Sequence, residues 1–107
     1  MLDLTILNQN YFKIKMLDGS ILNLKKLTQK MLLKTTFLDK EIEKANKNKD
    51  FEKILNLNVD RLHLILNNNK EGKVITKEEI EEFNAEIITA IIVAYSNWMQ
   101  EFNSNPN

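Results

Sequence analysis

The segment 76–102 constrains this chain more than any other part of the sequence. Its hydrophobic periodicity predicts one long helix, and Thr76 followed by Glu79 forms a capping box at the start. Within Ile87–Tyr95 the only polar side chain is Thr89. A surface helix needs only about one apolar stripe. A helix as apolar as this one therefore either lies at the centre of a bundle or is shared with a second chain.

Two apolar stripes run side by side along the predicted helix. One consists of Ile80, Phe83, Ile87, Ile91, Ala94 and Trp98, and the other of Ile88, Ile92, Tyr95 and Met99. We expect a partner-binding or self-association surface made of Ile88, Ile92, Tyr95, Trp98 and Met99. Tyr95 and Trp98 are residue types that anchor interfaces. Packing of the same two rings in the core is the alternative.

Composition excludes several classes of function. The 107 residues predict a single domain over 1–102 with a frayed polar tail over 103–107. Lys and Arg total 15 and Asp and Glu total 15, which argues against a nucleic-acid binder. The absence of Cys excludes disulfides and thiolate sites, and the one His, His63, is interpreted as a surface group. No apolar run predicts a membrane helix, and no secretory signal precedes the domain, so we expect a cytoplasmic protein that is not secreted.

Charge is distributed unevenly along the chain. Residues 1–77 carry 15 basic and 9 acidic side chains, whereas residues 78–107 carry 6 acidic side chains and no basic one. The acidic cluster consists of Glu78, Glu79, Glu81 and Glu82. It can complement the N-terminus of the long helix, or it can orient docking of a partner or a second copy.

The first 25 residues alternate apolar and polar side chains, which predicts β-strands. An Asp-Gly dipeptide marks a turn, and the register decides how long its loop is. A three-residue loop, Leu17–Gly19, sets Phe12 opposite Leu24 and Ile14 opposite Leu22, which gathers the apolar side chains on one face. We therefore predict this loop, with its glycine in the left-handed conformation.

The remaining segments complete a predicted α+β fold. Leu2–Leu7 alternates weakly and is expected to add a third strand, joined through the turn residues Asn8–Asn10. Thr28–Ala45 and Asp50–Leu66 predict two helices, each capped by its first residue. The apolar stripe of the second helix is Phe51, Leu55, Val59, Leu62 and Leu66. The prediction is a hairpin or three-stranded meander followed by three helices, the last one long.

The connection over 67–78, NNNKEGKVITKE, has the spacing of the twelve-residue EF-hand calcium loop. Its candidate ligands are Asn67, Asn69, Glu71 and Glu78, with Gly72 at the sharp-turn position. Only two of the four are carboxylates, and fewer carboxylates mean weaker calcium binding. The alternative is a polar helix connection with a glycine turn, and we expect no metal and no cofactor.

Three segments, taken in order, resemble the tail assembly chaperones of long-tailed phages and of phage-tail-like bacteriocins. They are FKIKMLDGSILNLKKLTQKM (Phe12–Met31), GKVITKEEI (Gly72–Ile80) and IIVAYSNW (Ile91–Trp98). The resemblance implies a non-enzymatic protein of the host cytoplasm, without catalytic residues, that works as a homo-oligomer. Its implied partner is the tape measure protein, a long apolar helical chain that such chaperones coat before the tail tube polymerises around it.

Two other classes of function stay open. One is a degenerate EF-hand-like calcium-binding module, which depends on the 67–78 loop. The other is a structural subunit of a virion or tail, which would remain in purified particles, whereas a chaperone would be missing from them. An enzyme is not expected, because the Ser, Thr and Lys side chains have no general base beside them in the sequence.

Overall fold

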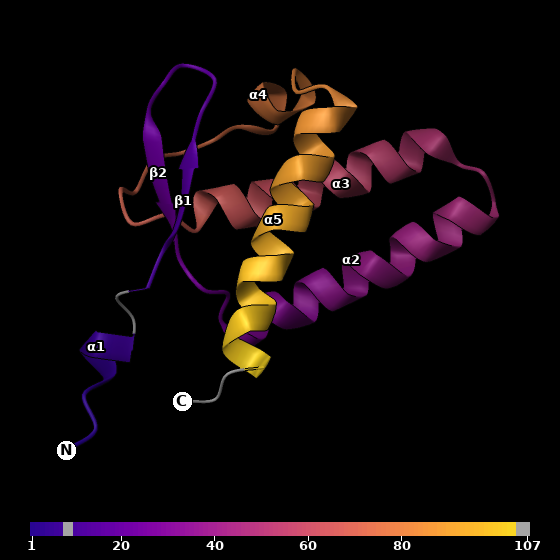
Figure 1. The fold of residues 1–107 in the computed structure, drawn as a ribbon. Helices are drawn as coiled ribbons and strands as arrows, with labels where there is room; N and C mark the ends of the chain where they lie inside the picture. Colours follow the sequence, from indigo (N-terminus) through magenta and orange to yellow (C-terminus); the bar gives the residue numbers. More distant parts are fainter. Residues whose placement is uncertain (8–9, 105–107) are drawn as a thin grey trace.

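The computed structural model describes residues 1–7 and 10–104, with side chains up to Glu101 (Figure 1). The elements, in order, are α1 (Leu4–Leu7), β1 (Phe12–Lys15), β2 (Ile21–Leu24), α2 (Gln29–Lys47), α3 (Phe51–Asn67), α4 (Lys77–Glu81) and α5 (Ala85–Ser104). The predicted α+β fold is confirmed, since an antiparallel hairpin precedes a set of helices that ends with a long one.

The hairpin has the predicted register. Phe12 pairs with Leu24 and Ile14 pairs with Leu22 across the two strands. Gly19, in the three-residue loop, has a φ of 87°, a conformation that glycine adopts without strain. Because apolar residues share one face in this register, β2 buries both of its leucines against the helices.

The outer edge of β2 is closed by the segment that follows α3. The backbone N–H of Lys70 donates to the carbonyl of Asn23 at 2.9 Å, and the N–H of Lys25 donates to the carbonyl of Asn68 at 2.8 Å. Both carboxylate oxygens of Glu71 accept from Asn23, one from its backbone N–H at 2.8 Å and the other from its side-chain amide at 2.9 Å. These bonds attach the hairpin to the end of α3.

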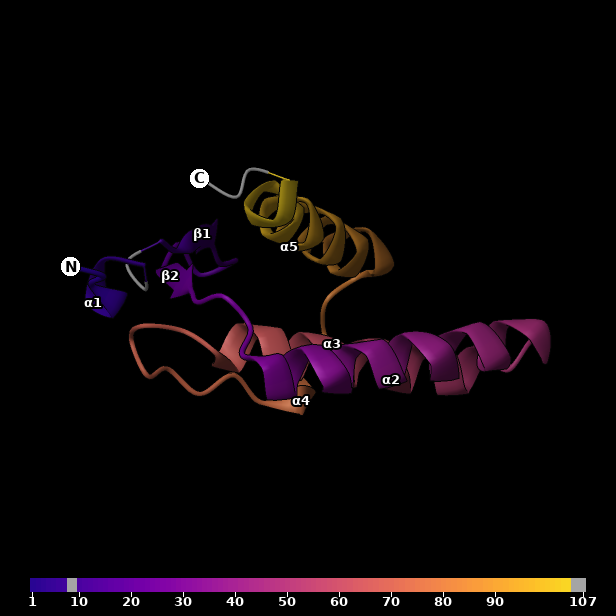
Figure 2. The ribbon, with the colours of Figure 1, turned by 90° about the horizontal axis from the view of Figure 1, so that it is seen from below.

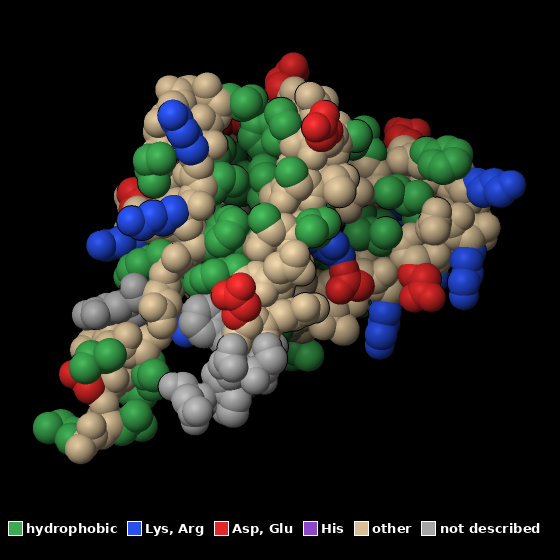
Figure 3. Space-filling model, viewed as in Figure 1, with side chains coloured by type: hydrophobic (Ala, Val, Ile, Leu, Met, Phe, Trp, Pro, Cys, Tyr) green, Lys and Arg blue, Asp and Glu red, His purple; other side chains and the backbone are tan. Residues whose placement is uncertain are grey.

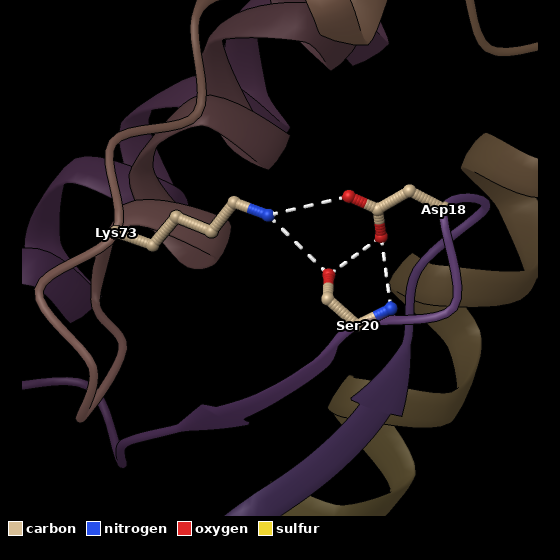
Figure 4. A network of polar contacts seen from close by, with 3 residues as sticks. All are labelled: Asp18, Ser20 and Lys73. Carbon is tan, nitrogen blue, oxygen red and sulfur yellow. Dashed lines mark hydrogen bonds and ion pairs between the residues drawn. The ribbon is translucent and has the colours of Figure 1, made fainter.

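A second attachment joins the hairpin turn to the same segment (Figure 4). The Asp18 carboxylate accepts from the N–H of Ser20 at 2.9 Å and from its hydroxyl at 2.6 Å. These two bonds lower the pKa of Asp18 below its ordinary value, with the hydroxyl bond as the larger cause. Lys73 Nζ lies 3.3 Å from the Ser20 hydroxyl and 3.6 Å from the Asp18 carboxylate. The hairpin is therefore attached to the segment after α3 at its turn as well as along β2.

The expected third strand is wrong. Leu4–Leu7 forms the single helical turn α1, which lies away from the hairpin (Figures 1 and 2). Asp3 explains the turn locally, because its carboxylate accepts from the N–H of Thr5 at 3.0 Å and from the Thr5 hydroxyl at 2.6 Å. The expected turn at Asn8–Asn10 lies mostly outside the described residues.

Helices α2 and α3 lie side by side and antiparallel (Figure 2). Both predicted N-caps are confirmed. The hydroxyl oxygen of Thr28 accepts from the N–H of Met31, and the carboxylate of Asp50 accepts from the N–H of Lys53. The two caps satisfy donors that helix starts otherwise leave unpaired. The pair projects beyond the other elements on the side where α2 turns into α3 (Figure 1).

The predicted apolar stripe of α3 is buried in its second half only. Val59, Leu62 and Leu66 lie in the core, whereas Phe51 and Leu55 are exposed. The hairpin, α4 and α5 gather around the C-terminal half of α3, so its first turns face only α2 (Figure 1).

The predicted single helix over 76–102 is wrong, because the chain breaks it into α4 and α5. The break falls at Glu82–Asn84, where the carbonyl oxygen of the Asn84 side chain accepts from the N–H of Ile87 at 2.9 Å and starts a new helix. The cap at Thr76 is confirmed by a bond from the N–H of Glu79. Helix α5 continues through Ser104 into the expected frayed tail, of which 105–107 lies outside the described residues.

The core lies where α3, the hairpin, α4 and α5 meet. Its buried side chains are Leu22, Leu24, Val59, Leu62, Ile65, Leu66, Ile75, Ile80, Ile88, Ile91 and Tyr95. Within Gln29–Lys47, Ala45 is the one buried residue of α2. Helix α2 therefore stands at the margin of the fold and packs mainly on α3.

Two leucines on α3 test this assignment of the core. Leu62 is fully buried and Leu55 is 51% exposed. Leu62→Ala should lower the free energy of unfolding by about 2–5 kcal/mol, because it removes buried methyl groups and leaves a cavity. Leu55→Ala, the matched control, should change it by less than about 0.5 kcal/mol, as surface substitutions do. Urea unfolding measures both, and similar losses for the two variants would contradict the packing described.

Candidate functional site

The predicted partner-binding set on α5 faces largely inward. Ile88 and Tyr95 are only 6% and 2% exposed, and both belong to the core. Ile92, Trp98 and Met99 are half-buried and pack against that core. The physical reason is that α5 lies across α3 and beside the hairpin, and these elements cover the side of α5 that carries Ile88 and Tyr95. The set as predicted is therefore not a free docking surface.

The two aromatic residues in the set belong to a ring cluster inside the fold. The rings of Tyr95 and Trp98 lie 5.5 Å apart, and each lies 5.8 Å from the ring of Phe12 on β1. The Tyr95 hydroxyl donates to the carbonyl of Lys25 at 2.6 Å, and burial raises the pKa of this phenol. Core packing, the alternative stated for these rings, is what the structure shows for Tyr95.

The candidate calcium loop is held together by its own asparagines. The side-chain oxygen of Asn67 accepts from the N–H of Ile75 at 2.8 Å, and that of Asn69 accepts from the N–H of Lys73 at 2.8 Å. The Asn69 amide nitrogen donates to the carbonyls of Leu66 and Lys73, each at 2.8 Å. Among the residues whose burial the structure describes, Asn69 is the buried polar one, so it acts as the internal scaffold of the connection.

The two acidic members of the calcium set lie in different settings. Glu71 bonds to Asn23 as described above, whereas Glu78 is exposed in the first turn of α4. In the part of the chain that the structure describes, no group of three or more His, Cys, Asp or Glu side chains could hold a metal ion. Calcium binding stays a hypothesis from the loop spacing.

Other polar side chains of α2, α3 and α4 form ion pairs. Asp60 pairs with Lys77 at 3.0 Å. Both residues line a shallow hollow beside Phe37. Arg61 pairs with Asp39 across α2 and α3, and its Nε is buried with no hydrogen-bond partner among the described residues. These contacts join α2, α3 and α4.

An apolar groove separates β1 from α5 (Figure 3). Its volume is about 380 Å³, and its walls are the continuous run Phe12–Leu17 and, opposite, Phe83, Ile87, Ala90, Ile91 and Ala94. We call it the β1–α5 groove. The space-filling view shows hydrophobic side chains along this channel between the hairpin and α5.

A second apolar surface lies on α2. Leu33 and Phe37, one helical turn apart, are 72% and 62% exposed, and Leu32 beside them is also exposed. We call these three residues the α2 face. Leu32 also lines, with Met99 and Leu27, a hollow of about 210 Å³ between α2 and α5. One member of the predicted set on α5, Met99, therefore borders the α2 face.

Sequence reasoning missed the α2 face, although a signal was present. Leu32, Leu33 and Phe37 widen the apolar stripe of the first predicted helix beyond what one neighbouring helix can cover. A surface helix needs only about one apolar stripe, and this criterion, which singles out 76–102, also singles out this helix.

Comparison of the chain with protein-family models, with curated proteins and with solved structures finds no match in any of the three. Among the described residues, no helix is both long enough and apolar enough to cross a lipid bilayer. A functional argument therefore depends on the two apolar surfaces and on the resemblance in the sequence.

The bonds between Glu71 and Asn23 predict a pH dependence of stability. The N–H and the side-chain amide of Asn23, in that order, lower the pKa of Glu71 below its ordinary value of 4.5. A lowered pKa in the folded state means that the stabilisation is present above about pH 4.5 and is lost as the pH falls through the folded pKa. Glu71→Gln should therefore lower the melting temperature at pH 7, and its deficit should shrink toward about pH 3.

Thermal unfolding of both proteins across this pH range measures the effect. Glu43→Gln on the exposed side of α2 removes the same charge and is the control. A Glu71→Gln deficit that stays constant from neutral to acidic pH would rule out the carboxylate as its source.

Proposed function

We propose that this protein is a non-enzymatic tail assembly chaperone of a phage or of a phage-tail-like bacteriocin. In this role it shields the apolar helical tape measure protein in the host cytoplasm while the tail assembles. Support comes from the order of the three resembling segments and from the hairpin followed by helices in which they lie. The surface proposed to meet the partner is the α2 face, in place of the stripe on α5.

One observation carries the proposal. The 19-residue helix α2 packs mainly on α3, and it exposes large apolar side chains on the side away from that neighbour. Leu33 and Phe37 point to the same side because they are four residues apart. Isolated exposed apolar residues are ordinary, but clustered ones mark interaction sites. Such a cluster on an uncovered helix suits an apolar helical partner.

The proposed mode of binding is helix against helix. An amphipathic or apolar partner helix would lay its side chains along α2 and complete a three-helix arrangement with α3. Burying Leu33 and Phe37 would contribute about 1.5–3 kcal/mol each to binding. Lys30, Lys34 and Lys40 are exposed on the same helix, and they keep the free protein hydrated while its partner is absent.

Co-expression with a tape measure protein tests this proposal. The chain should co-purify with that protein and increase its soluble yield. Leu33→Ser together with Phe37→Ser should abolish both effects, because the change removes the apolar contacts. The variant should keep its melting temperature within a few degrees, since both side chains are exposed in the free protein.

The matched control is Lys40→Ser with Lys47→Ser, which places the same new residues at exposed positions of the same helix. This control should co-purify as the unaltered protein does. Failure of the unaltered chain to bind or solubilise the tape measure protein would contradict the proposal. Detection of the chain in purified tails or virions would instead support a structural subunit.

A further inference from the structure

The two edges of the hairpin differ. Asn23 lies directly opposite Lys13, and the backbone groups of Asn23 point away from β1, since they bond to Lys70 and Glu71. In an antiparallel ladder, residues opposite each other point their N–H and C=O groups in the same sense, both inward or both outward. The backbone groups of Lys13 and of Lys15, two residues further, therefore point out from the free edge of β1. Within the described residues no hydrogen bond satisfies them.

This open edge forms one wall of the β1–α5 groove. Six consecutive residues, Phe12–Leu17, line the groove. Successive side chains of a strand alternate between its two faces, so a wall made of consecutive residues is a strand seen along its edge. The opposite wall is apolar and comes from α5 and from Phe83 in the turn before it. Unpaired backbone groups beside an apolar channel are what an added β-strand needs.

The N-terminal arm, residues 1–7, has the complementary pattern. Leu2, Leu4 and Ile6 alternate with Asp3 and Thr5, and each of the three apolar residues is more than half exposed. None of the residues of α1, which lies within the arm, is buried. A single helical turn that buries no side chain is marginal in water, so little opposes its change to an extended strand.

We propose that the N-terminal arm of a second copy of this chain adds as a strand to the open edge of β1 and fills the β1–α5 groove. In this arrangement Leu2, Leu4 and Ile6 face α5, on the side of the sheet where β1 places its apolar side chains. Asp3 and Thr5 face the opposite side, where β1 carries Lys13 and Lys15.

Charge agrees with this pairing. Asp3 is the one charged side chain of the arm, and the exposed face of β1 carries two lysines with no ion pair among the described residues. Opposite charges on neighbouring strands of one face stabilise a sheet. Both the apolar pattern and the charge of the arm therefore match the groove and its rim.

Contacts at the base of the arm favour exchange between copies over folding back. Lys26 Nζ donates to the carbonyl of Leu7 at 3.4 Å, and Lys70 Nζ lies 5.3 Å from the centre of the Tyr11 ring. Lys70 belongs to the segment that closes the edge of β2, so these contacts hold the exit of the arm on the closed side of the hairpin. The groove lies on the other side, within reach of an arm from another copy.

Cross-linking tests the proposal, because the chain has no cysteine. Chains carrying Thr5→Cys are mixed with chains of different tag length that carry Lys15→Cys, and a short bis-maleimide joins the two thiols. Docking raises the local thiol concentration from the micromolar to the millimolar range, so covalent heterodimer should form at least about tenfold faster than in the control mixture. In the control, Thr5→Cys chains are mixed with Glu43→Cys chains, whose thiol lies on the exposed side of α2.

The remaining outcomes overturn the proposal. Equal rates in the two mixtures would show that the arm does not reach β1 of another copy. A single chain with both Thr5→Cys and Lys15→Cys that cross-links only within itself at micromolar concentration would show that the arm folds back on its own strand.

A second comparison keeps the test independent of cysteine chemistry. Ile6→Asp places a charge on the apolar side of the arm, whereas Thr5→Asp places one on the side that faces Lys13 and Lys15. Light scattering should give assemblies for the unaltered chain and for Thr5→Asp, and monomers for Ile6→Asp. A monomeric unaltered chain at high concentration, or assembly that Ile6→Asp leaves intact, would contradict the proposal. The α2 face has no part in it, so it stands or falls separately from the proposed function.

Discussion

The run of three asparagines at the end of α3 is the constraint on which the rest of the structure depends. Asn67 and Asn69 bond to the backbone of the connection that follows them, and so hold it in place as it leads to α4. Asn68 accepts from the N–H of Lys25 through its carbonyl and fixes the chain that leaves β2. Because buried polar groups must be paired, these bonds determine where the hairpin lies on α3, and with it the wall that supports α5.

The same attachment makes the two sides of the hairpin unequal. The connection covers the edge of β2 and leaves the edge of β1 open beside the β1–α5 groove. The molecule measures 51 × 31 × 20 Å, and a body this thin cannot bury all the apolar side chains it carries. The surplus appears at the arm, on the α2 face and in the groove, where part of the first apolar stripe of α5 forms one wall.

Local rules predicted the local structure well. The caps at Thr28, Asp50 and Thr76 and the register of the hairpin follow from hydrogen-bonding side chains and from alternation, and all are confirmed. The break at Asn84 was missed because apolar periodicity runs across it without interruption, although Asn is itself a capping residue. The helical turn in the arm was missed because the alternating side chains of the arm predict a strand. A strand forms only where it can pair with the edge of another strand, and alternation alone does not show such an edge.

The candidate site was harder to predict than the fold. Apolar side chains at helical spacing look alike in a sequence whether they end in a core or on a surface. Ile88 and Tyr95 are buried while Leu33 and Phe37 are exposed, and the difference arises from which helix the hairpin and α3 cover. Which helix is covered depends on long-range contacts such as the hydrogen bond from Tyr95 to Lys25. The hydrophobic periodicity within one helix does not reveal such contacts.

Amide hydrogen exchange at single-residue resolution tests the central claim, that the hairpin has one closed edge and one open edge. In dilute protein the account predicts slow exchange at Asn23 and Lys25, whose N–H groups are bonded to the segment after α3. It predicts fast exchange at Lys13 and Lys15, slowing as the protein concentration rises and arms occupy the grooves. Protection of Lys13 and Lys15 equal to that of Asn23 in dilute protein would contradict it.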